Sequence, residues 1–486
     1  MHINQLQNPA LFRQQCYIDG RWRDADNRAT IEVVNPADRA VLGSVPDMGA
    51  AETDAAIAAA NSAFRSWRNR TAAERGAILH RWHELMLENQ DDLGALMTLE
   101  QGKPLPEAKG EIAYAAAFLQ WFSEEAKRAY GDTIPAARPG QHIVVIKQPV
   151  GVSAAITPWN FPAAMITRKA GAALAAGCTM VVKPASETPF SALALAELGE
   201  RAGLPAGVFN VVTGNAREIG QALNSSSTVR KISFTGSTEV GRILMRQSAE
   251  HIQKISLELG GNAPFIVFDD ADVDRAVEGA IASKFRNTGQ TCVCVNRFIV
   301  QDGIHDRFVE KLKAEMAKLK VGDGFEEGVN QSALINDAAV GKVREHLDNA
   351  LEGGATVLAG GVPHPLGRQF VTPTLVTGVK PDMKVCREET FGPLAAIIRF
   401  ETEAEAIEIA NDTPFGLSAY FYSRDIHRIW RVAEALETGM VGINEGMISN
   451  PAAPFGGVKE SGLGREGSKY GMDEYMEVKY LCMGSE

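Results

Sequence analysis

The run Val150-Gly151-Val152-Ser153-Ala154-Ala155-Ile156 is short and apolar, which is typical of a single buried strand. A helix-length amphipathic segment follows it, and the same alternation then repeats along the chain. Further strand-like runs lie at 179–182, 208–212, 232–234 and 255–259. Repeated strand–helix alternation predicts a parallel sheet with helices on both faces and ligands at the carboxyl ends of the strands. The fold class expected from the sequence is therefore α/β.

A second alternating series begins at the apolar run 263–268 and continues to about residue 445. We therefore place a domain boundary near residue 262. The closing run 476–481 looks like an edge strand, and such a strand often pairs with another part of its chain or with a second subunit.

The first third of the chain is mainly helical. The helical spacing of its apolar residues predicts a helix through Ile57, Ala60, Phe64 and Trp67. Thr71, with a glutamate three residues later, predicts a capping box at the start of the next helix.

The composition excludes several classes of function. Hydrophobic residues make up 45% and charged residues 22% of the 486 residues, as in an ordinary globular protein. The net charge of −11 argues against partners such as nucleic acid or an anionic membrane surface. No apolar stretch approaches the roughly 20 residues that cross a bilayer. The sequence begins without the pattern of a signal peptide and its six cysteines form no disulfide framework, so we expect a cytoplasmic protein.

The segment Phe285-Arg286-Asn287-Thr288-Gly289-Gln290-Thr291-Cys292-Val293-Cys294 holds the candidate nucleophile. A reactive cysteine must be reachable as a thiolate, and Gly289 lets the backbone ahead of Cys292 turn and approach a ligand closely. A lone cysteine is more often a buried structural thiol. Zinc is disfavoured because Cys292 and Cys294 have no cysteine or histidine partners at ligand spacing, so no metal is expected. Taken alone, the segment leaves a nucleophile and a structural thiol both open.

Two polar residues lie at or just past the ends of predicted strands. Asn160 lies in Pro158-Trp159-Asn160-Phe161-Pro162, where its amide suits an oxyanion donor and a helix cap equally well. Glu258 lies between two leucines, and apolar surroundings raise a carboxyl pKa toward the range of a general base. A carboxylate that merely caps the glycine turn after it is an equal alternative.

The segment 234–241 joins a strand to a helix and has the form of a phosphate-binding turn, because helix N-termini present free N–H groups. It is neither the G-x-G-x-x-G fingerprint nor a Walker A loop, so an ordinary helix start explains it as well. Lys183 ends another strand. There it suits a contact with a ribose or a phosphate, and an exposed lysine without such a contact is the alternative.

Seven segments together resemble the NAD(P)-dependent aldehyde dehydrogenases, in that family's order and spacing and over nearly the whole chain. They are 158–162, 183–185, 234–237, 257–261, 287–292, 389–393 and 454–457. The resemblance implies an α/β fold of three parts. These are a Rossmann-type cofactor domain (1–129 and 151–262), an α/β catalytic domain (263–467) and a small β oligomerisation element (130–150 and 468–486). It also implies a homo-oligomer, a dimer or a tetramer, of which we favour the tetramer.

The resemblance assigns the chemistry to three residues. Cys292 is implied to form a thiohemiacetal with the aldehyde, while the Asn160 amide and the Cys292 backbone N–H hold the oxyanion. Hydride transfer then leaves a thioester, and Glu258 is implied to activate the water that releases the acid. This division suits a thiolate nucleophile and a carboxylate base.

The resemblance also implies a set of cofactor contacts, with Glu389 expected on the nicotinamide ribose. The set is Trp159, Lys183, Ser186, Gly236, Ser237, Glu389 and Phe391. NAD-preferring members often carry a glutamate at the position of Ser186, which would repel a 2′-phosphate. Ser186 with Lys183 therefore favours NADP, although the charge of Glu187 opposes it and NAD stays possible.

Arg168, Arg286 and Ser449 match the carboxylate-binding positions of the succinate-semialdehyde dehydrogenase subgroup. A guanidinium suits a terminal carboxylate because its planar fork donates two parallel hydrogen bonds, although each arginine taken alone is more typical of a surface or capping role. We expect oxidation of succinate semialdehyde, with glutarate semialdehyde or another aldehyde as alternatives. Glu445 and Pro451 depart from the subgroup pattern near Ser449, and a carboxylate there would repel an acidic substrate.

Cys294 resembles the second cysteine of relatives with a redox-responsive loop, in which it forms a disulfide with the nucleophile. A small packed residue is the alternative, since the bond requires alpha carbons within roughly 7 Å. Two other classes of function compete with the enzyme: a non-catalytic structural member of the fold, and a cysteine hydrolase without a cofactor. The intact Cys292, Glu258 and Asn160 argue against a non-catalytic member. The seven segments contain no histidine that could act as the base of a cysteine hydrolase.

Overall fold

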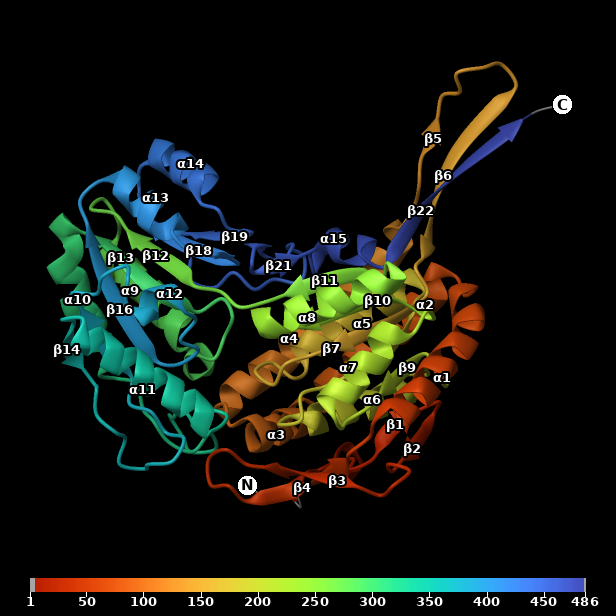
Figure 1. Ribbon diagram of the computed structural model, residues 1–486, viewed down its shortest axis with the longest axis horizontal. Helices are drawn as coiled ribbons and strands as arrows, with labels where there is room; N and C mark the ends of the chain where they lie inside the picture. The colour runs from red at the N-terminus through yellow and green to blue at the C-terminus, as the bar shows by residue number, and fades with distance from the viewer. Residues whose placement is uncertain (1–4, 485–486) are drawn as a thin grey trace.

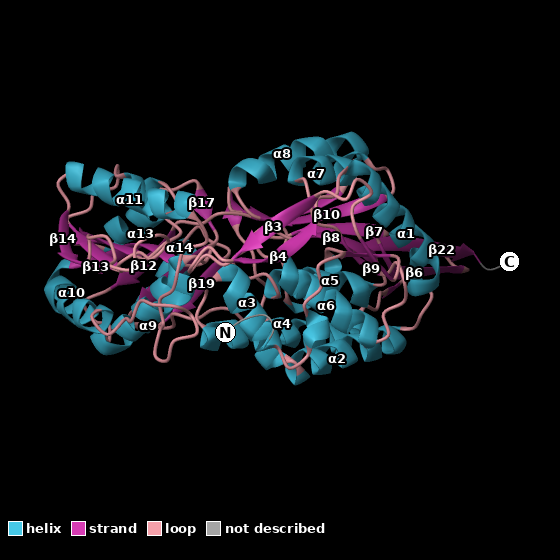
Figure 2. Ribbon diagram, turned by 90° about the horizontal axis from the view of Figure 1, so that it is seen from below, coloured by secondary structure: helices cyan, strands magenta, loops and turns pink. Residues whose placement is uncertain are grey.

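The computed structural model describes residues 5–484 and places two large β-sheets side by side, with helices packed against them (Figure 1). A narrow β-arm projects from one end of the molecule. Seen from below, helices lie on both faces of the sheets (Figure 2), which is the layered α/β architecture that the strand–helix alternation predicts. None of the helices within residues 5–484 is long and apolar enough to cross a membrane.

The first sheet has eight strands in the order β2-β1-β9-β8-β7-β10-β11-β21. Neighbours from β9 to β11 pair in parallel, whereas β1 and β21 pair antiparallel at the two sides. The bounds are β1 Cys16–Ile18, β2 Arg21–Arg23, β7 Val152–Ile156, β8 Thr179–Lys183, β9 Phe209–Val211, β10 Val229–Thr235, β11 Lys254–Glu258 and β21 Gly462–Leu463.

The five parallel strands follow the doubly wound pattern. Along the chain they come as β7, β8, β9, β10 and β11, but in space β7 lies at the centre with β8 and β10 on either side. The strand order reverses between β7 and β10, and such a switch point opens a crevice for a ligand. The Rossmann-type sheet implied by the resemblance is therefore present.

The second sheet has seven strands in the order β14-β15-β16-β13-β12-β18-β19, parallel except for β14. The bounds are β12 Ala263–Val267, β13 Val295–Gln301, β14 Thr356–Ala359, β15 Thr374–Thr377, β16 Leu394–Phe400, β18 Ser418–Tyr422 and β19 Met440–Ile443. Two small ribbons complete the strands outside the arm: β3 Thr30–Val34 with β4 Val41–Pro46, and β17 Phe415–Gly416 with β20 Val458–Lys459.

Helices surround both sheets. Those around the first sheet are α1 Ala50–Arg68, α2 Ala72–Glu88, α3 Gln90–Gln101, α4 Leu105–Glu125, α5 Ala164–Ala176, α6 Pro189–Arg201, α7 Ala216–Ser225, α8 Thr238–Ser248 and α15 Ser468–Asp473. Those around the second sheet are α9 Val273–Phe285, α10 Asp302–Met316, α11 Asp337–Glu352, α12 Lys384–Arg387, α13 Glu403–Asn411 and α14 Ile426–Ala435. Short 3₁₀ turns are η2 Pro9–Leu11, η3 Ala126–Arg128, η4 Ala249–His251 and η5 Arg286–Gly289.

The largest core cluster fills the space between the first sheet and the helices α2, α4, α5 and α6, where Trp82 and Phe190 are fully buried. The helix predicted through Trp67 is α1, and that side chain is also fully buried. The predicted capping box is confirmed: the Glu74 backbone N–H donates to the Thr71 hydroxyl at 3.2 Å, and the Thr71 N–H donates to the Glu74 carboxylate at 2.7 Å.

The arm consists of β5 Thr133–Ile134, β6 Gln141–Pro149 and β22 Met476–Gly484. The predicted edge strand 476–481 lies in β22, which pairs antiparallel with β6 along its whole length. Several apolar side chains of the arm are exposed, among them Val478 at 70% and Tyr480 at 59%. These side chains find no core within residues 5–484.

The chain leaves the first sheet after Glu258 and enters the second at Ala263, on either side of the predicted boundary near residue 262. One short strand crosses back, because β21 joins the first sheet although the sequence placed residues 263–467 in the catalytic domain. The division into three parts with separate roles stays a prediction.

Candidate active site

A cavity of about 360 Å³ lies where the two sheets face each other. The first sheet lines it with residues at the carboxyl ends of its strands: 159–160 after β7, 236–237 after β10, and Glu258 at the end of β11. The second sheet lines it with residues that precede its strands: Cys292 before β13, and 389–391 before β16. The prediction that ligands bind at the carboxyl ends of the strands therefore fits the cavity lining of the first sheet only.

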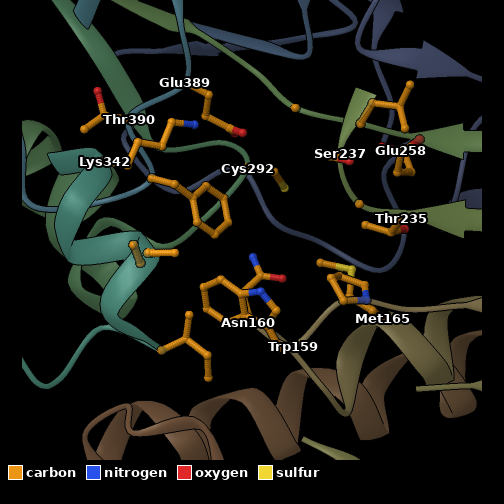
Figure 3. A pocket seen from close by; sticks show the side chains of 18 of the residues that line it. Trp159, Asn160, Met165, Thr235, Ser237, Glu258, Cys292, Lys342, Glu389 and Thr390 are labelled. Carbon is orange, nitrogen blue, oxygen red and sulfur yellow. The ribbon is translucent and has the colours of Figure 1, made fainter. Parts of the chain in front are cut away.

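The loop before Cys292 turns through left-handed backbone conformations. Asn287, Thr288 and Gly289 have φ angles of 51°, 55° and 78°. A Cβ atom on Gly289 would lie 2.3 Å from the carbonyl oxygen of Gly392, so only glycine fits at this contact. The turn directs the side chain of Cys292 into the cavity (Figure 3).

The Cys292 side chain is half-buried in the cavity wall. Burial raises the pKa of its thiol to about 12, with Arg168 and Arg286 acting in the opposite direction. At neutral pH the thiol therefore keeps its proton in this arrangement, and a base has to accept that proton when the sulfur attacks.

Asn160 faces Cys292 from the opposite wall (Figure 3). Its side-chain amide donates to the carbonyl oxygen of Gln290 at 3.1 Å. An amide NH₂ has two hydrogens, so one donor remains for an oxygen of a ligand. The backbone carbonyl of Asn160 accepts hydrogen bonds from Lys103 Nζ at 2.8 Å and from Asn287 Nδ2 at 3.0 Å, which fixes its peptide.

Glu258 is a buried carboxyl at the cavity wall, 3% exposed. Neither of its oxygens has a hydrogen-bond partner among residues 5–484. Burial, and then the negative charge of Glu466, raise the pKa of Glu258 well above its ordinary value, while Arg168 and Lys169 lower it less. A carboxylate with a raised pKa accepts a proton more readily at neutral pH, as a general base must.

A charged cluster behind Glu258 was not predicted from the sequence. Lys169, on α5, is ion-paired with Glu466 and donates to the Thr235 hydroxyl at 2.7 Å. Burial alone would raise the pKa of Glu466, but Arg168 and Lys169 outweigh it, so that this pKa lies below its ordinary value. The sequence does carry a signal: two charged residues interrupt the apolar helix 164–176, and an acidic residue interrupts the glycine-rich segment 462–467.

A second cavity, of about 340 Å³, adjoins the first, with Phe161 in its wall next to Asn160 of the first cavity. Arg286 and Ser449, two of the predicted substrate-binding residues, line it. The Arg286 guanidinium lies over the Phe161 ring, 5.1 Å from its centroid. No carboxylate among residues 5–484 forms an ion pair with Arg286, so its charge is open to a ligand.

Tyr114 also lines the second cavity and was not predicted. Burial raises the pKa of its phenol, and Arg168, Arg286 and a hydrogen bond with Ser449 act in the opposite direction. The hydroxyl of Tyr114 therefore lies among the three predicted substrate-binding residues. Its position on a helix, far from them in the sequence, gave no local signal.

Arg168, the third predicted substrate-binding residue, lies outside the lining of both cavities but next to Tyr114 of the second one. It is 2% exposed, lies over the Phe455 ring at 4.2 Å and is ion-paired with Glu466. A buried guanidinium requires a counter-ion, and Glu466 provides it. Burial alone would lower the pKa of Arg168, but the charge of Glu466 raises it above its ordinary value.

Five of the seven predicted cofactor residues line the first cavity: Trp159, Gly236, Ser237, Glu389 and Phe391. The carboxylate of Glu389 accepts a hydrogen bond from the Gly261 N–H at 3.1 Å, and burial raises its pKa to about 7. Ser237 caps α8, accepting from the Val240 N–H at 3.3 Å. The N-terminus of α8 therefore opens toward the cavity, as a phosphate-binding turn requires.

Lys183 and Ser186 lie outside the lining of this cavity. Lys183 ends β8 beside Ile156 of β7, so it belongs to the same edge of the first sheet. Burial lowers the pKa of Lys183, and the charge of Glu187 acts against this shift. Lys342, which the sequence did not single out, instead lines the cavity from α11 near Glu389.

Cys294 is 5% exposed and lines neither cavity. Its thiol donates to the Lys284 carbonyl oxygen at 3.5 Å, in the last turn of α9.

Glu445 also lies outside both cavities, and its carboxylate accepts from the Met447 N–H at 2.9 Å. Pro451 is half-buried and its carbonyl accepts from Ser468 N–H at 2.7 Å.

The site thus joins a thiol, an amide donor and a buried carboxyl around one cavity, at the switch point of a doubly wound sheet. This is the architecture of a dinucleotide-dependent enzyme with a cysteine nucleophile. The chain matches the aldehyde dehydrogenase family over residues 22–481, and it belongs to that family.

Its relatives include two curated bacterial enzymes that it matches over almost their whole length. The chain is 65% identical to a glutarate-semialdehyde dehydrogenase of Pseudomonas aeruginosa, over 99% of both chains. It is 64% identical to the succinate-semialdehyde dehydrogenase [NADP(+)] of Escherichia coli, over 99% of this chain and 100% of that protein. The crystal structure of succinate-semialdehyde dehydrogenase from Burkholderia pseudomallei superposes with a TM-score of 0.98 at 62% identity, covering 99% of this chain and 100% of that one.

Proposed function

We propose that this protein oxidises succinate semialdehyde to succinate with NADP. The observation that carries the proposal is the pairing of two cavities: Cys292 lines one, and the unpaired Arg286 lines the adjoining one. With its aldehyde group at Cys292, succinate semialdehyde would extend the carboxylate at its other end toward Arg286 and Ser449. The relatives are named for the semialdehydes of glutarate and succinate, and these names support the same substrate class.

The first cavity fits a dinucleotide. It opens on the N-terminus of α8, and a Cβ on Gly236 there would lie 2.4 Å from the Phe234 ring, so a larger residue would crowd this turn. Glu389, with its pKa near 7, offers acceptors for ribose hydroxyls. NADP, when bound, would accept the hydride of the substrate. Glu187 is exposed, so its opposition to a 2′-phosphate is screened by solvent.

In the first step the Cys292 sulfur attacks the aldehyde carbon, and the thiol proton passes to a base. The remaining N–H of the Asn160 amide and the Cys292 backbone N–H donate to the developing oxyanion. Hydride departure from this oxyanion then leaves a thioester on Cys292, and the one proton released is the thiol proton that the base has taken.

In the second step Glu258 accepts a proton from the water that attacks the thioester. The acid leaves, and Cys292 recovers its thiol. Glu258 suits this step because burial raises its pKa and leaves its oxygens free of protein partners. Behind Glu258, Lys169 is ion-paired with Glu466, and the charges of both residues act on the Glu258 carboxyl.

The decisive experiment is a panel of succinate semialdehyde, glutarate semialdehyde and neutral aldehydes, each measured with NADP and with NAD by nicotinamide absorbance. We expect the highest kcat/KM for succinate semialdehyde with NADP. A folded Cys292→Ala variant should lose activity, and turnover at the parent's rate would refute the mechanism. A higher kcat/KM for glutarate semialdehyde would name that acid as the substrate, and no reduction of either dinucleotide would indicate a structural member of the fold.

We further propose that the protein forms a homo-oligomer through the arm, because exposed apolar side chains of the arm gain stability when a second subunit covers them. A tetramer is expected from light scattering after gel filtration. The six cysteines are free, which suits a reducing cytoplasm.

A further inference from the structure

The α3–α4 turn and the start of α4 bury several polar side chains, of which Lys103 and Glu111 line the second cavity. Gln101 is 0%, Lys103 2% and Glu111 4% exposed, and Lys103 and Glu111 form an ion pair. A buried ion pair contributes little more to stability than apolar residues of the same volume, because both charges must leave water. Stability alone is therefore a weak explanation for this pair.

Lys103 directs its ammonium group at the segment that carries Asn160. Besides Glu111, the Nζ atom donates to the Asn160 carbonyl oxygen at 2.8 Å and lies over the Phe161 ring, 4.0 Å from its centroid. The same carbonyl accepts from Asn287 Nδ2 at 3.0 Å. Two donors from opposite loops thus hold one peptide, and that peptide sets the direction of the Asn160 side chain.

Glu111 holds the other end of the same segment. While one carboxylate oxygen pairs with Lys103, the other accepts from the backbone N–H groups of Ala163 and Ala164 at 3.0 and 3.2 Å, at the start of α5. The residues from 160 to 164 are therefore attached at one end to Lys103, just before α4, and at the other end to Glu111 within α4.

The loop of the nucleophile is attached to the same turn. Gln101 Nε2 donates to Asn287 Oδ1 at 3.2 Å, and the Asn287 N–H donates to the Glu107 carboxylate at 2.7 Å. One buried turn thus contacts both loops that face each other across the cavity.

We infer that Lys103, anchored by Glu111, is a positioning residue: it fixes the Asn160 peptide so that the side-chain amide is directed at the aldehyde oxygen. The inference rests on the proposed function, in which Asn160 donates to the oxyanion. A donor acts on a transition state only when it is already placed, and a displacement of about 1 Å costs roughly 100-fold in rate.

The test compares Lys103→Met with the wild-type enzyme on succinate semialdehyde and NADP. We expect kcat to fall roughly 10- to 100-fold, with the aldehyde KM changed less than about 3-fold. Because Lys103→Met leaves Glu111 without its counter-ion, Lys103→Met/Glu111→Gln is measured as well. It removes both charges of this buried pair and keeps the acceptor for Ala163 and Ala164, so it should fold and show the same loss of kcat.

A double-mutant cycle separates positioning from general damage. In an Asn160→Ala background the lysine has no amide left to position, so adding Lys103→Met should lower kcat by less than about 3-fold. A further 10-fold loss in that background would overturn the inference. So would a normal kcat with a raised KM for carboxylate aldehydes only, since that pattern means direct contact with the substrate.

Glu100→Gln is the matched control. Glu100 is a buried carboxylate that accepts from the Phe190 and Ser191 N–H groups at the start of α6, just as Glu111 does at α5, but without a contact to Asn160. It should alter the melting temperature and leave kcat unchanged; an equal loss of kcat would overturn the inference. If the wild-type enzyme does not oxidise aldehydes, the proposed function is wrong. If the wild type is active and Lys103→Met is equally active, only the inference about Lys103 is wrong.

Discussion

The Arg168 guanidinium is ion-paired with Glu466, in a site that buries both side chains. The carboxylate is also ion-paired with Lys169, so a single negative charge faces two positive ones. The cluster therefore keeps one surplus positive charge behind Cys292 and Glu258 as long as the Glu258 carboxyl is protonated. This surplus attracts an anionic substrate without requiring that Arg168 touch it.

Arg286 and Arg168 should respond differently to substitution. Arg286→Ala removes the one unpaired guanidinium of the second cavity, so the KM for succinate semialdehyde should rise roughly 10- to 100-fold, with little change for propanal. Arg168→Ala, in contrast, should lower the free energy of unfolding by about 3 kcal/mol or more, because Glu466 loses a buried partner. Steady-state kinetics on both aldehydes and urea unfolding measure the two effects; equal losses on both aldehydes for Arg286→Ala would contradict a carboxylate site.

The raised pKa of Glu389 makes stability depend on pH. The folded protein binds the Glu389 proton up to about pH 7, whereas the unfolded chain releases it near the ordinary value of 4.5. The contribution of this residue to stability is therefore full below pH 4.5 and declines until about pH 7. Glu389→Gln removes the decline, so its stability relative to wild type should increase by about 2–3 kcal/mol between pH 5 and pH 8. Urea unfolding at the two pH values tests this, and a pH-independent difference would contradict it.

Cys294 gives a test of redox control. Peroxide would oxidise the two thiols of Cys292 and Cys294 to one disulfide and be reduced to water. Because the Cys294 thiol now donates to the Lys284 carbonyl, the loop has to rearrange first, and inactivation should take minutes. We expect thiol reductants to restore wild-type activity but not that of Cys294→Ser, and restoration of both would exclude the switch.

Glu187 tests the preference for NADP. If its charge opposes the 2′-phosphate across solvent, Glu187→Gln should raise kcat/KM for NADP about 2- to 5-fold and leave that for NAD unchanged. The gain should shrink at high salt. An equal change for both dinucleotides would show that the charge does not act on the phosphate.

Much of the architecture follows from local patterns. Apolar runs such as 150–156 form buried strands in any parallel sheet, and the Thr71 capping box needs only residues within one turn. Asn160 and Glu258 were each visible at the end of a predicted strand, since strand ends converge at one edge of a sheet. Cys292 was visible in the polar segment that follows Gly289. Lys342 and Tyr114 were not visible, because each comes from a helix whose cavity-facing side no local pattern marks.

The amino-acid sequence by itself therefore determined the α/β class, the family and the residue types available for chemistry, because periodicity and motif spacing are local properties. Only the tertiary structure decided their electrostatic states and partners. Glu466 lies 298 residues after Arg168 in the chain yet neutralises it, and Lys103 holds a peptide 57 residues away. Such pairings depend on which distant segments the core brings together, and burial then determines which charges need a partner and which remain open for a substrate.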